Sequence, residues 1–223
     1  MLNQEQLTGR DESHLQWQDG IGLHPDCWAA FDRLREQAAE VGIDLCIASG
    51  FRSFERQLAI WNAKARGERG VHDDLGEPVD MAALDDERRM HAIMRYSALP
   101  GGSRHHWGTD LDIYDAAAMP ADYQLQLTPQ EYAADGIFGA LAAWLDGQLA
   151  ESAEFYRPYA TDRGGVAPEP WHLSYRPLAQ DCAGCFTVEM LRDALQSSPL
   201  ELSSTVFHNL PGIFERYIAV PAL

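Results

Sequence analysis

Histidine and carboxylate side chains come together in one short segment near the middle of the chain. His105 precedes Asp110 and Asp112, and residues 109–114 alternate between polar and apolar side chains. This alternation predicts a half-buried strand with both aspartates on one face. Neutral imidazole nitrogen and carboxylate oxygen are ligands that suit Zn²⁺. The segment therefore predicts part of a zinc site, because a catalytic zinc ion needs three protein ligands.

A second segment, residues 168–175, could supply what the first one lacks. His172 can bind a metal ion, and Glu169 lies three residues before it. Pro170 disfavours a helical turn, so we expect an extended or turn conformation with Trp171 packed as a wall. A carboxylate beside a metal site can serve as the general base of a hydrolase. A lone histidine is more often structural than a ligand, but two segments with this chemistry favour a catalytic metal site.

The two segments resemble the signature pair of the LAS metallopeptidases. That group includes VanY-like D-alanyl-D-alanine carboxypeptidases, related L,D-carboxypeptidases and phage L-alanyl-D-glutamate endopeptidases. Its motif reads Ser-x-His-x-x-Gly-x-Ala-x-Asp and then Glu-x-x-His, and residues 103–112 and 169–172 are similar to it in the same order. Residues 49–53, Ser-Gly-Phe-Arg-Ser, resemble a third stretch of the family. The resemblance covers about residues 43–175.

The resemblance implies three zinc ligands, a general base and a set of substrate-binding residues. The implied zinc ligands are His105, Asp112 and His172, and Glu169 is the implied general base that activates the attacking water. The implied substrate-binding residues are Arg52, which would bind and orient the substrate, and Ser103 and Gln57, which would line the same pocket. An arginine suits this role because its planar fork binds a carboxylate through two hydrogen bonds.

Three features depart from the family pattern. Asp110 stands where the family has alanine, which places a second acid near the metal. It either orients a ligand from behind, tunes the zinc-bound water or replaces Asp112 as the ligand, and the motif position favours Asp112 as the ligand. His106, next to the implied ligand, is expected to be a pocket or surface residue. The long interval at residues 68–100 is interpreted as an insertion that reshapes substrate access.

The implied reaction is hydrolysis of a peptidoglycan-type stem peptide, with Zn²⁺ as the cofactor and this small peptide as the partner. We expect a D,D- or L,D-carboxypeptidase that releases a terminal D-amino acid. One alternative is an endopeptidase with the same site, and another is a zinc-binding module without catalysis. A thiol-redox protein would instead use Cys182 and Cys185, although ordinary thiols are the simpler interpretation of this pair.

The site residues must be positioned by helices and short strands. Periodicity and capping residues predict helices at about residues 28–42, 53–67, 80–96, 139–149 and within 187–223. A further helix is expected to start at Thr128, and a second strand is expected at residues 43–48, besides the strand at 109–114. This pattern predicts an α+β fold, in which helices surround a small, mostly antiparallel sheet with the zinc site at the sheet edge. We expect residues 1–180 to form the zinc peptidase domain and residues 181–223 a C-terminal helical extension packed on it.

Composition narrows the class of protein further. The 223 residues include 46% hydrophobic residues, which is too many for a disordered chain. The formal net charge of −17 argues against a nucleic-acid partner and against a polybasic membrane anchor. No apolar run approaches the ~20 residues of a membrane helix, and the first residues do not resemble a secretory signal. Cytoplasmic residence is the default expectation, action in the periplasm or on the cell wall stays open, and the oligomeric state is not predicted.

Overall fold

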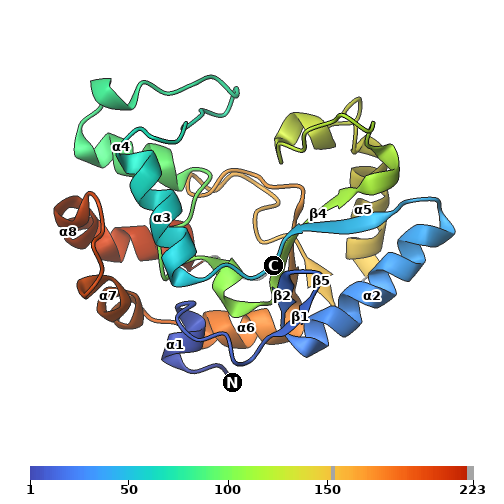
Figure 1. Ribbon diagram of the computed structural model, residues 1–223, viewed down its shortest axis with the longest axis horizontal. Helices are drawn as coiled ribbons and strands as arrows, with labels where there is room; N and C mark the ends of the chain where they lie inside the picture. The colour runs from blue at the N-terminus through green and yellow to red at the C-terminus, as the bar shows by residue number, and fades with distance from the viewer. Residues whose placement is uncertain (152–153, 220–223) are drawn as a thin grey trace.

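A four-stranded antiparallel sheet lies at the centre of the fold (Figure 1). The computed structural model describes residues 1–151 and 154–219. The strand order is β3-β4-β6-β5, with bounds Leu45–Ser49, Asp110–Asp115, His172–Tyr175 and Phe155–Tyr156 respectively. All three pairings in this sheet are antiparallel, and β4 and β6 are the inner strands. The predicted α+β class with a small antiparallel sheet is therefore confirmed.

The alternation in β4 separates an apolar face from a polar one. Leu111 and Ile113 are fully buried in a hydrophobic core, together with Leu173 of β6. Two helices cover this face: α2 (Pro25–Glu40) and α5 (Gly139–Glu151). The helix α2 begins with a proline at its first turn and is followed by Gly42 in the left-handed region. The opposite face of β4 carries the two aspartates, as the sequence predicts.

A second hydrophobic core lies among five helices on the other side of the molecule. They are α3 (Phe54–Ala65), α4 (Asp86–Met94), α6 (Arg176–Cys185), α7 (Val188–Gln196) and α8 (Ser203–Ile213), the last continued by a π-helical turn at Phe214–Ile218. Trp61 of α3 is buried in this core and donates a hydrogen bond from Nε1 to the carbonyl oxygen of Glu201 at 3.0 Å. The C-terminal helices thus share a core with α3 and α4, and the expected domain boundary at residue 180 falls inside α6.

Two predicted helices differ in extent from the structure. In place of one helix at 80–96, the chain forms a 3₁₀ turn at Met81–Ala83 and then α4. Each begins with its own cap, because the side chains of Asp80 and Asp85 accept hydrogen bonds from the backbone of the following turn. The predicted start at Thr128 has the expected capping box, but it opens only a 3₁₀ turn, Pro129–Tyr132.

The N-terminal segment holds elements that the sequence did not reveal. After the short helix α1 (Gln4–Leu7), the strands β1 (Gln16–Gln18) and β2 (Ile21–Leu23) form a separate antiparallel hairpin. Such short strands carry too few residues to show a period. No helix in the described part of the chain combines the length and the apolar composition that crossing a membrane requires.

Candidate active site

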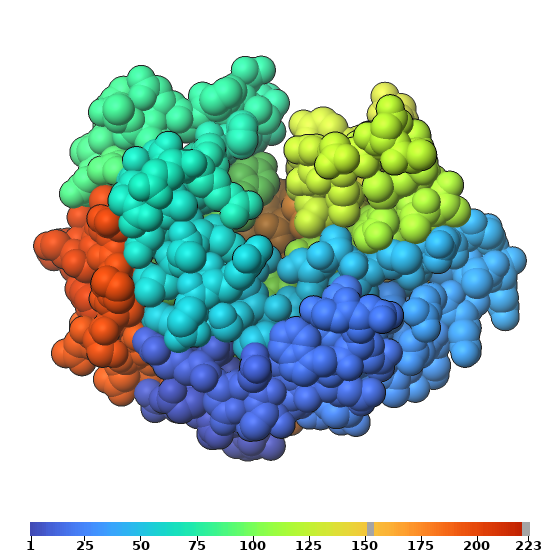
Figure 2. Space-filling view, viewed as in Figure 1, coloured from blue at the N-terminus to red at the C-terminus, as the bar shows by residue number. Residues whose placement is uncertain are grey.

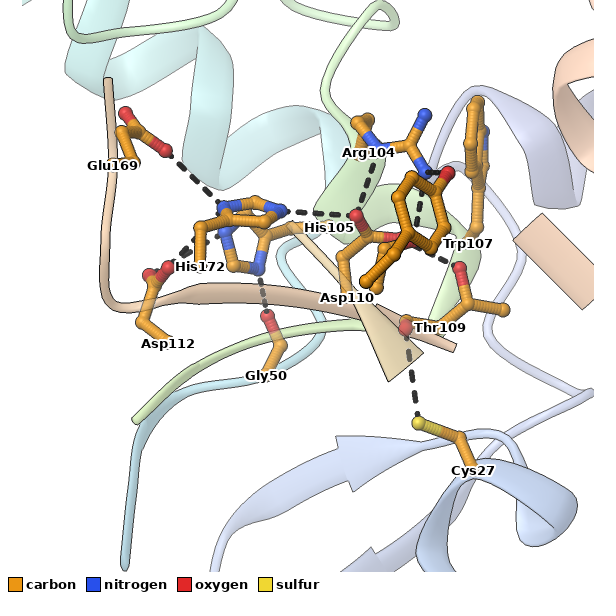
Figure 3. Close-up of polar contacts among 12 residues, drawn as sticks. Cys27, Gly50, Arg104, His105, Trp107, Thr109, Asp110, Asp112, Glu169 and His172 are labelled. Carbon is orange, nitrogen blue, oxygen red and sulfur yellow. Dashed lines mark hydrogen bonds and ion pairs between the residues drawn. The ribbon is translucent and has the colours of Figure 1, made fainter. Parts of the chain in front are cut away.

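Three elements bring the predicted metal ligands together (Figure 3). His105 lies in a 3₁₀ turn, Arg104–Trp107, that leads into β4. Asp112 of β4 lies directly opposite His172, the first residue of β6. Gly108 connects the turn to β4 with a φ of +68°, and a Cβ there would lie 2.3 Å from a Leu15 side-chain carbon. Glycine is required at this corner both for its conformation and for the close approach.

The three side chains form a compact cluster of ligand atoms. His105 Nε2 lies 3.4 Å from Asp112 Oδ2, and His172 Nδ1 lies 3.3 Å from Asp112 Oδ1. One ligand atom from each residue lies within 4.8 Å of the others, and all three residues are buried. The sequence predicts the zinc site at the sheet edge; the structure places the candidate cluster near the sheet, with its strand ligands on the two inner strands, β4 and β6.

The remaining ring nitrogens of both histidines are held by outer partners. His105 Nδ1 lies 2.8 Å from the carbonyl oxygen of Gly50, and His172 Nε2 lies 2.9 Å from Asp110 Oδ1. Because a carbonyl or ionised carboxylate oxygen can only accept a hydrogen bond, each histidine donates N–H to its outer partner and directs the other nitrogen into the cluster. This is the arrangement in which imidazoles bind a metal ion.

The cluster fits a zinc ion by its chemistry as well as by its spacing. Asp112 Oδ1 is buried and has no hydrogen-bond partner, which leaves a carboxylate oxygen in the centre of the cluster for a cation. Burial alone would raise the pKa of Asp112, but the two neighbouring histidines lower it by more than burial raises it. The carboxylate is therefore ionised. Two imidazole nitrogens and one carboxylate oxygen match a catalytic zinc site with a fourth position left open.

Asp110 lies behind the cluster rather than in it. Its carboxylate is fully buried and accepts hydrogen bonds from His172, from Arg104 Nε at 2.8 Å, and from the hydroxyls of Thr109 and Ser174. Burial would raise the pKa of Asp110, and the adjacent Arg104 guanidinium lowers it below its usual range. Among the roles left open for Asp110, the structure thus supports orientation of a ligand, and of the two aspartates Asp112 faces the other two ligands.

Glu169 points at the cluster from the turn before β6. Its Oε2 lies 3.2 Å from His172 Nδ1, and its side chain is 13% exposed. The backbone amide of His172 donates to the Glu169 carbonyl, which makes the turn expected around Pro170. The ring of Tyr159 packs edge-on against His172, with 5.1 Å between the ring centroids, and its carbonyl oxygen accepts the Glu169 amide. The carboxylate is therefore fixed beside the cluster and reaches water.

The cluster opens into a cavity of about 600 Å³. Figure 2 shows the hollow between the part of the chain that holds α3 and α4 and the part around residues 116–135. Arg52 and Ser103 line it together with Glu169. Gln57 is fully buried behind the wall, where its Oε1 accepts a hydrogen bond from Arg52 Nη1 at 2.9 Å. The structure thus corrects the expectation that Gln57 lines the pocket: it holds Arg52 in place.

His106 differs from its expected role as a pocket or surface residue. Its ring is fully buried, accepts a hydrogen bond from the Gly101 amide at Nε2 and donates from Nδ1 to the Arg52 carbonyl. Burial lowers the pKa of His106 to about 3, so the ring is neutral. His106 is a structural residue that fixes the backbone of Arg52.

The interval at residues 68–100 borders the cavity. Residues 69–74 and 96–98 are part of the wall, and residues 126–130 face them from the other side. This position agrees with the interpretation that the interval shapes substrate access.

The two cysteines of the proposed redox pair lie on one helix, α6. Cys182 is a free thiol buried in the second core, and burial raises its pKa to about 12. Cys185 is also a free thiol, and its Sγ donates to the Asp181 carbonyl within the same helix. A redox cysteine needs a lowered pKa, so the structure gives the thiol-redox alternative no support.

Sequence reasoning missed three polar residues around the site. Arg104 pairs with Asp110, Tyr159 packs on His172, and Lys64 lines the cavity. The first two have no signal in the sequence, because neither contact follows the period of a helix or a strand. Lys64 did have one: it is the only lysine among the 223 residues.

Comparison with known proteins identifies the family to which most of the chain is similar. Residues 20–178 match the VanY D-alanyl-D-alanine carboxypeptidase family. An uncharacterized protein of Haemophilus influenzae is 44% identical over 103 residues, which cover 44% of this chain and 70% of that protein. A second uncharacterized protein of the same organism is 35% identical over 122 residues, covering 54% and 92%.

Solved structures of carboxypeptidases share the fold. VanYB in complex with D-alanine-D-alanine aligns with a TM-score of 0.53 at 20% identity, over 86% of this chain and 87% of that chain. The LD-carboxypeptidase LdcB aligns with a TM-score of 0.52 at 20% identity, over 92% and 78%. A VanY D,D-pentapeptidase in complex with Zn(II) aligns with a TM-score of 0.52 at 20% identity, over 86% and 88%.

The fold and the cluster of two histidines and an aspartate define a metallopeptidase. Because the family match covers more than two thirds of the residues, the chain belongs to the VanY D-alanyl-D-alanine carboxypeptidase family. This confirms the resemblance seen in the motifs and the assignment as a carboxypeptidase-type hydrolase.

Proposed function

We propose that the protein is a zinc-dependent D,D- or L,D-carboxypeptidase that removes a terminal D-amino acid from a peptidoglycan-type stem peptide. One observation carries the proposal: a buried cluster of His105, Asp112 and His172 lies beside Glu169, in the same cavity as the guanidinium of Arg52. A carboxypeptidase must hold a terminal carboxylate at a fixed place relative to its metal, and this cavity contains both kinds of group.

Each side chain has a distinct task in the proposed reaction. His105, Asp112 and His172 would hold the zinc ion, which when bound supplies a Lewis acid at the scissile carbonyl and makes nearby water more acidic. Glu169 accepts the proton of the attacking water and returns it to the leaving amine. Arg52 binds the terminal carboxylate of the substrate through its fork, while Gln57 and Ser49 hold the guanidinium by hydrogen bonds of 2.9 and 3.3 Å.

Removing the proposed base separates catalysis from metal binding. We expect Glu169→Gln to retain one zinc ion per chain and to lower kcat by about 10²–10⁴-fold on a stem pentapeptide or tetrapeptide, because only the proton transfer is lost. Metal analysis and mass spectrometry of the products measure the two quantities. The matched control is Glu189→Gln, which changes an exposed acid on α7 and should leave both unchanged.

The same digests identify the reaction. Release of a single terminal D-amino acid supports the carboxypeptidase, whereas internal fragments would identify the endopeptidase alternative. A zinc-loaded wild-type protein that cleaves neither peptide would refute the proposal in favour of a non-catalytic module. Wild-type turnover that persists in Glu169→Gln would refute the role of Glu169.

A further inference from the structure

The only lysine of the chain lies in the wall of the active-site cavity. Lys64 belongs to the last turn of α3, is partly buried, and donates a hydrogen bond from Nζ to Ser97 Oγ at 2.7 Å. Both residues line the cavity. The other cationic residues of the chain are all arginines. A lysine placed here, in a protein with a net charge of −17, lies where a ligand can reach it.

Lys64 is accompanied by a second cation without a carboxylate partner. Arg69 lines the same cavity, and neither Lys64 nor Arg69 forms an ion pair with any residue that the structure describes. The aspartates of the same wall are satisfied elsewhere: Asp74 pairs with Arg95 at 2.7 Å, and Asp73 accepts hydrogen bonds from two backbone amides at 2.9 Å. A partly buried cation without a charged partner is unfavourable, so Lys64 is suited to an anion that enters from outside, and the exposed guanidinium of Arg69 in the same wall can bind it as well.

We infer that Lys64 and Arg69 form a second anion subsite, which binds a carboxylate of the peptide substrate other than its terminal one. The inference rests on the proposed function. Arg52 lies just before the start of α3 and Lys64 lies in its last turn, so the two cations occupy different places along the wall of one cavity. Because Arg52 is the proposed partner of the terminal carboxylate, an anion at Lys64 and Arg69 comes from another residue of the bound peptide. The second carboxylate therefore belongs to a residue upstream of the scissile bond.

Stem peptides carry carboxylates of this kind in two places. One is the α-carboxylate of a γ-linked D-glutamate, and the other is the side-chain carboxylate of diaminopimelate. Both present the same chemistry to an ammonium and a guanidinium. The environment of Lys64 favours an anion over a neutral group, because burial lowers the pKa of its amine to about 8 and a bound carboxylate would stabilise the charged form.

Three synthetic pentapeptides test the subsite. The first carries both upstream carboxylates, the second has the D-glutamate α-carboxylate amidated, and the third has lysine in place of diaminopimelate. With Lys64→Met, we expect kcat/KM on the first peptide to fall about tenfold or more, mainly through KM, because a charge-assisted hydrogen bond is lost. On the peptide that lacks the recognised carboxylate, wild type and variant should differ by less than about twofold.

The control variant is Arg56→Met, which removes a positive charge from the exposed side of the same helix, outside the cavity wall. It should cleave all three peptides as the wild type does. An effect of Lys64→Met that is equal on all three peptides, or equal to that of Arg56→Met, overturns the subsite while the proposed function stands. If the wild type cleaves none of the peptides, the proposed function fails, and the inference fails with it.

A binding measurement provides a readout that does not depend on turnover. In an untagged protein an amine-acylating reagent has only Lys64 and the N-terminal amine to modify. In zinc-loaded Glu169→Gln, we expect the first peptide to slow acylation of Lys64, as followed by mass spectrometry, and the peptide without the recognised carboxylate to leave the rate unchanged. Equal protection by all three peptides would overturn the inference.

Discussion

Asp110 holds a metal ligand and neutralises a buried cation at the same time. Its carboxylate bonds to His172 and to Arg104, whose guanidinium also donates to the hydroxyls of Tyr156 and Ser174 at 2.7 Å and lies over the ring of Trp107. Because His172 donates to Asp110, its other nitrogen is directed at the cluster and made a better ligand. The family motif has alanine at this position, so the carboxylate that contacts His172 here is a departure from the motif.

Removing Asp110 should therefore affect both stability and metal binding. We expect Asp110→Ala to lower the free energy of unfolding of the metal-free protein by about 3–5 kcal/mol, since Arg104 remains buried without its partner. Zinc affinity should fall about 10–100-fold. Urea denaturation and competition with a chelator measure the two. The double variant Arg104→Met with Asp110→Ala should lose less stability than Asp110→Ala alone, and an additive loss would contradict the pairing.

Lys64, the proposed binding residue, lowers the stability of the folded protein because its ammonium group is partly buried. Burial lowers the pKa of its amine from 10.5 to about 8, so the unfolded chain binds a proton more tightly than the folded one. We expect Lys64→Met to raise the free energy of unfolding at pH 7 by about 1–3 kcal/mol. The gain should shrink between pH 8 and 10.5, because in this range the wild-type unfolded state binds more protons and wild-type stability rises with pH. Urea denaturation at pH 7 and pH 10 checks this, and a gain that grows with pH would contradict it.

At the scale of elements, an arginine joins the two segments that border the cavity. Arg95, just after α4, forms paired hydrogen bonds with Asp74 and with Asp162, at 2.6–3.0 Å, and donates to the carbonyl of Gly165. This ties the interval at 68–100 to the segment that leads to Glu169. The arginine lowers the pKa of Asp162 to about 2. The ion pair of Arg95 with Asp162 is therefore fully formed at a pH above the usual pKa of an aspartate. It is lost as the pH falls through about 2.

Cutting this tie should loosen the cavity wall without unfolding the protein. With Arg95→Met we expect faster amide hydrogen exchange in residues 70–79 and 160–167 and a higher KM, because the wall is less well ordered. The control is Arg88→Met, which removes an exposed ion pair with Asp85 on the same helix. Exchange that is accelerated throughout α2 as well would indicate general destabilisation and would contradict the prediction.

The predicted elements show which parts of a fold a sequence can specify. The capping residue Ser53 and the periodicity after it located α3, and alternation located β4, since both patterns arise from neighbours along the chain. The break before α4 was not predicted, because the spacing of apolar residues continues through it. Only the two capping residues, Asp80 and Asp85, mark the break. The hairpin of β1 and β2 was missed because three-residue strands are too short to show alternation.

At the scale of the whole molecule, the C-terminal helices are part of the structure that supports the site. They contribute buried residues to the second core, which also contains Phe54 and Trp61 of α3; these are Leu191, Ala194, Leu195, Leu200, Val206, Leu210, Ile213, Tyr217 and Ile218. Because α3 starts directly after Arg52, loss of this core would displace a proposed substrate-binding residue.

Truncation tests how strongly residues 1–186 depend on the C-terminal helices for their stability. We expect deletion of residues 187–223 to abolish cooperative unfolding, since it exposes the large side chains of α3 and α4 to water. The milder variant Leu210→Ala should lower the free energy of unfolding by about 2–5 kcal/mol. Leu75→Ala, at a side chain that is 80% exposed, should have little effect. A truncated protein that unfolds cooperatively and binds zinc would show that residues 1–186 suffice.

The sequence by itself determined the class of chemistry. The spacing of His105, Asp112, Glu169 and His172, together with Arg52, predicted a metallopeptidase, because the types of ligand and base that this reaction needs are few and their order along the chain is recognisable. The family match and the cluster of three ligands agree with that prediction.

Only the tertiary structure decided how those residues are held and what surrounds them. The separate roles of Asp110 and Asp112, the burial of His106 and Gln57, and the exposure of Lys64 to the cavity depend on which strands pair and which helices pack together. Contacts between residues that are tens of positions apart leave no period in a single sequence. The identity of a side chain limits what it can do, and its partners in space select which of those roles it takes.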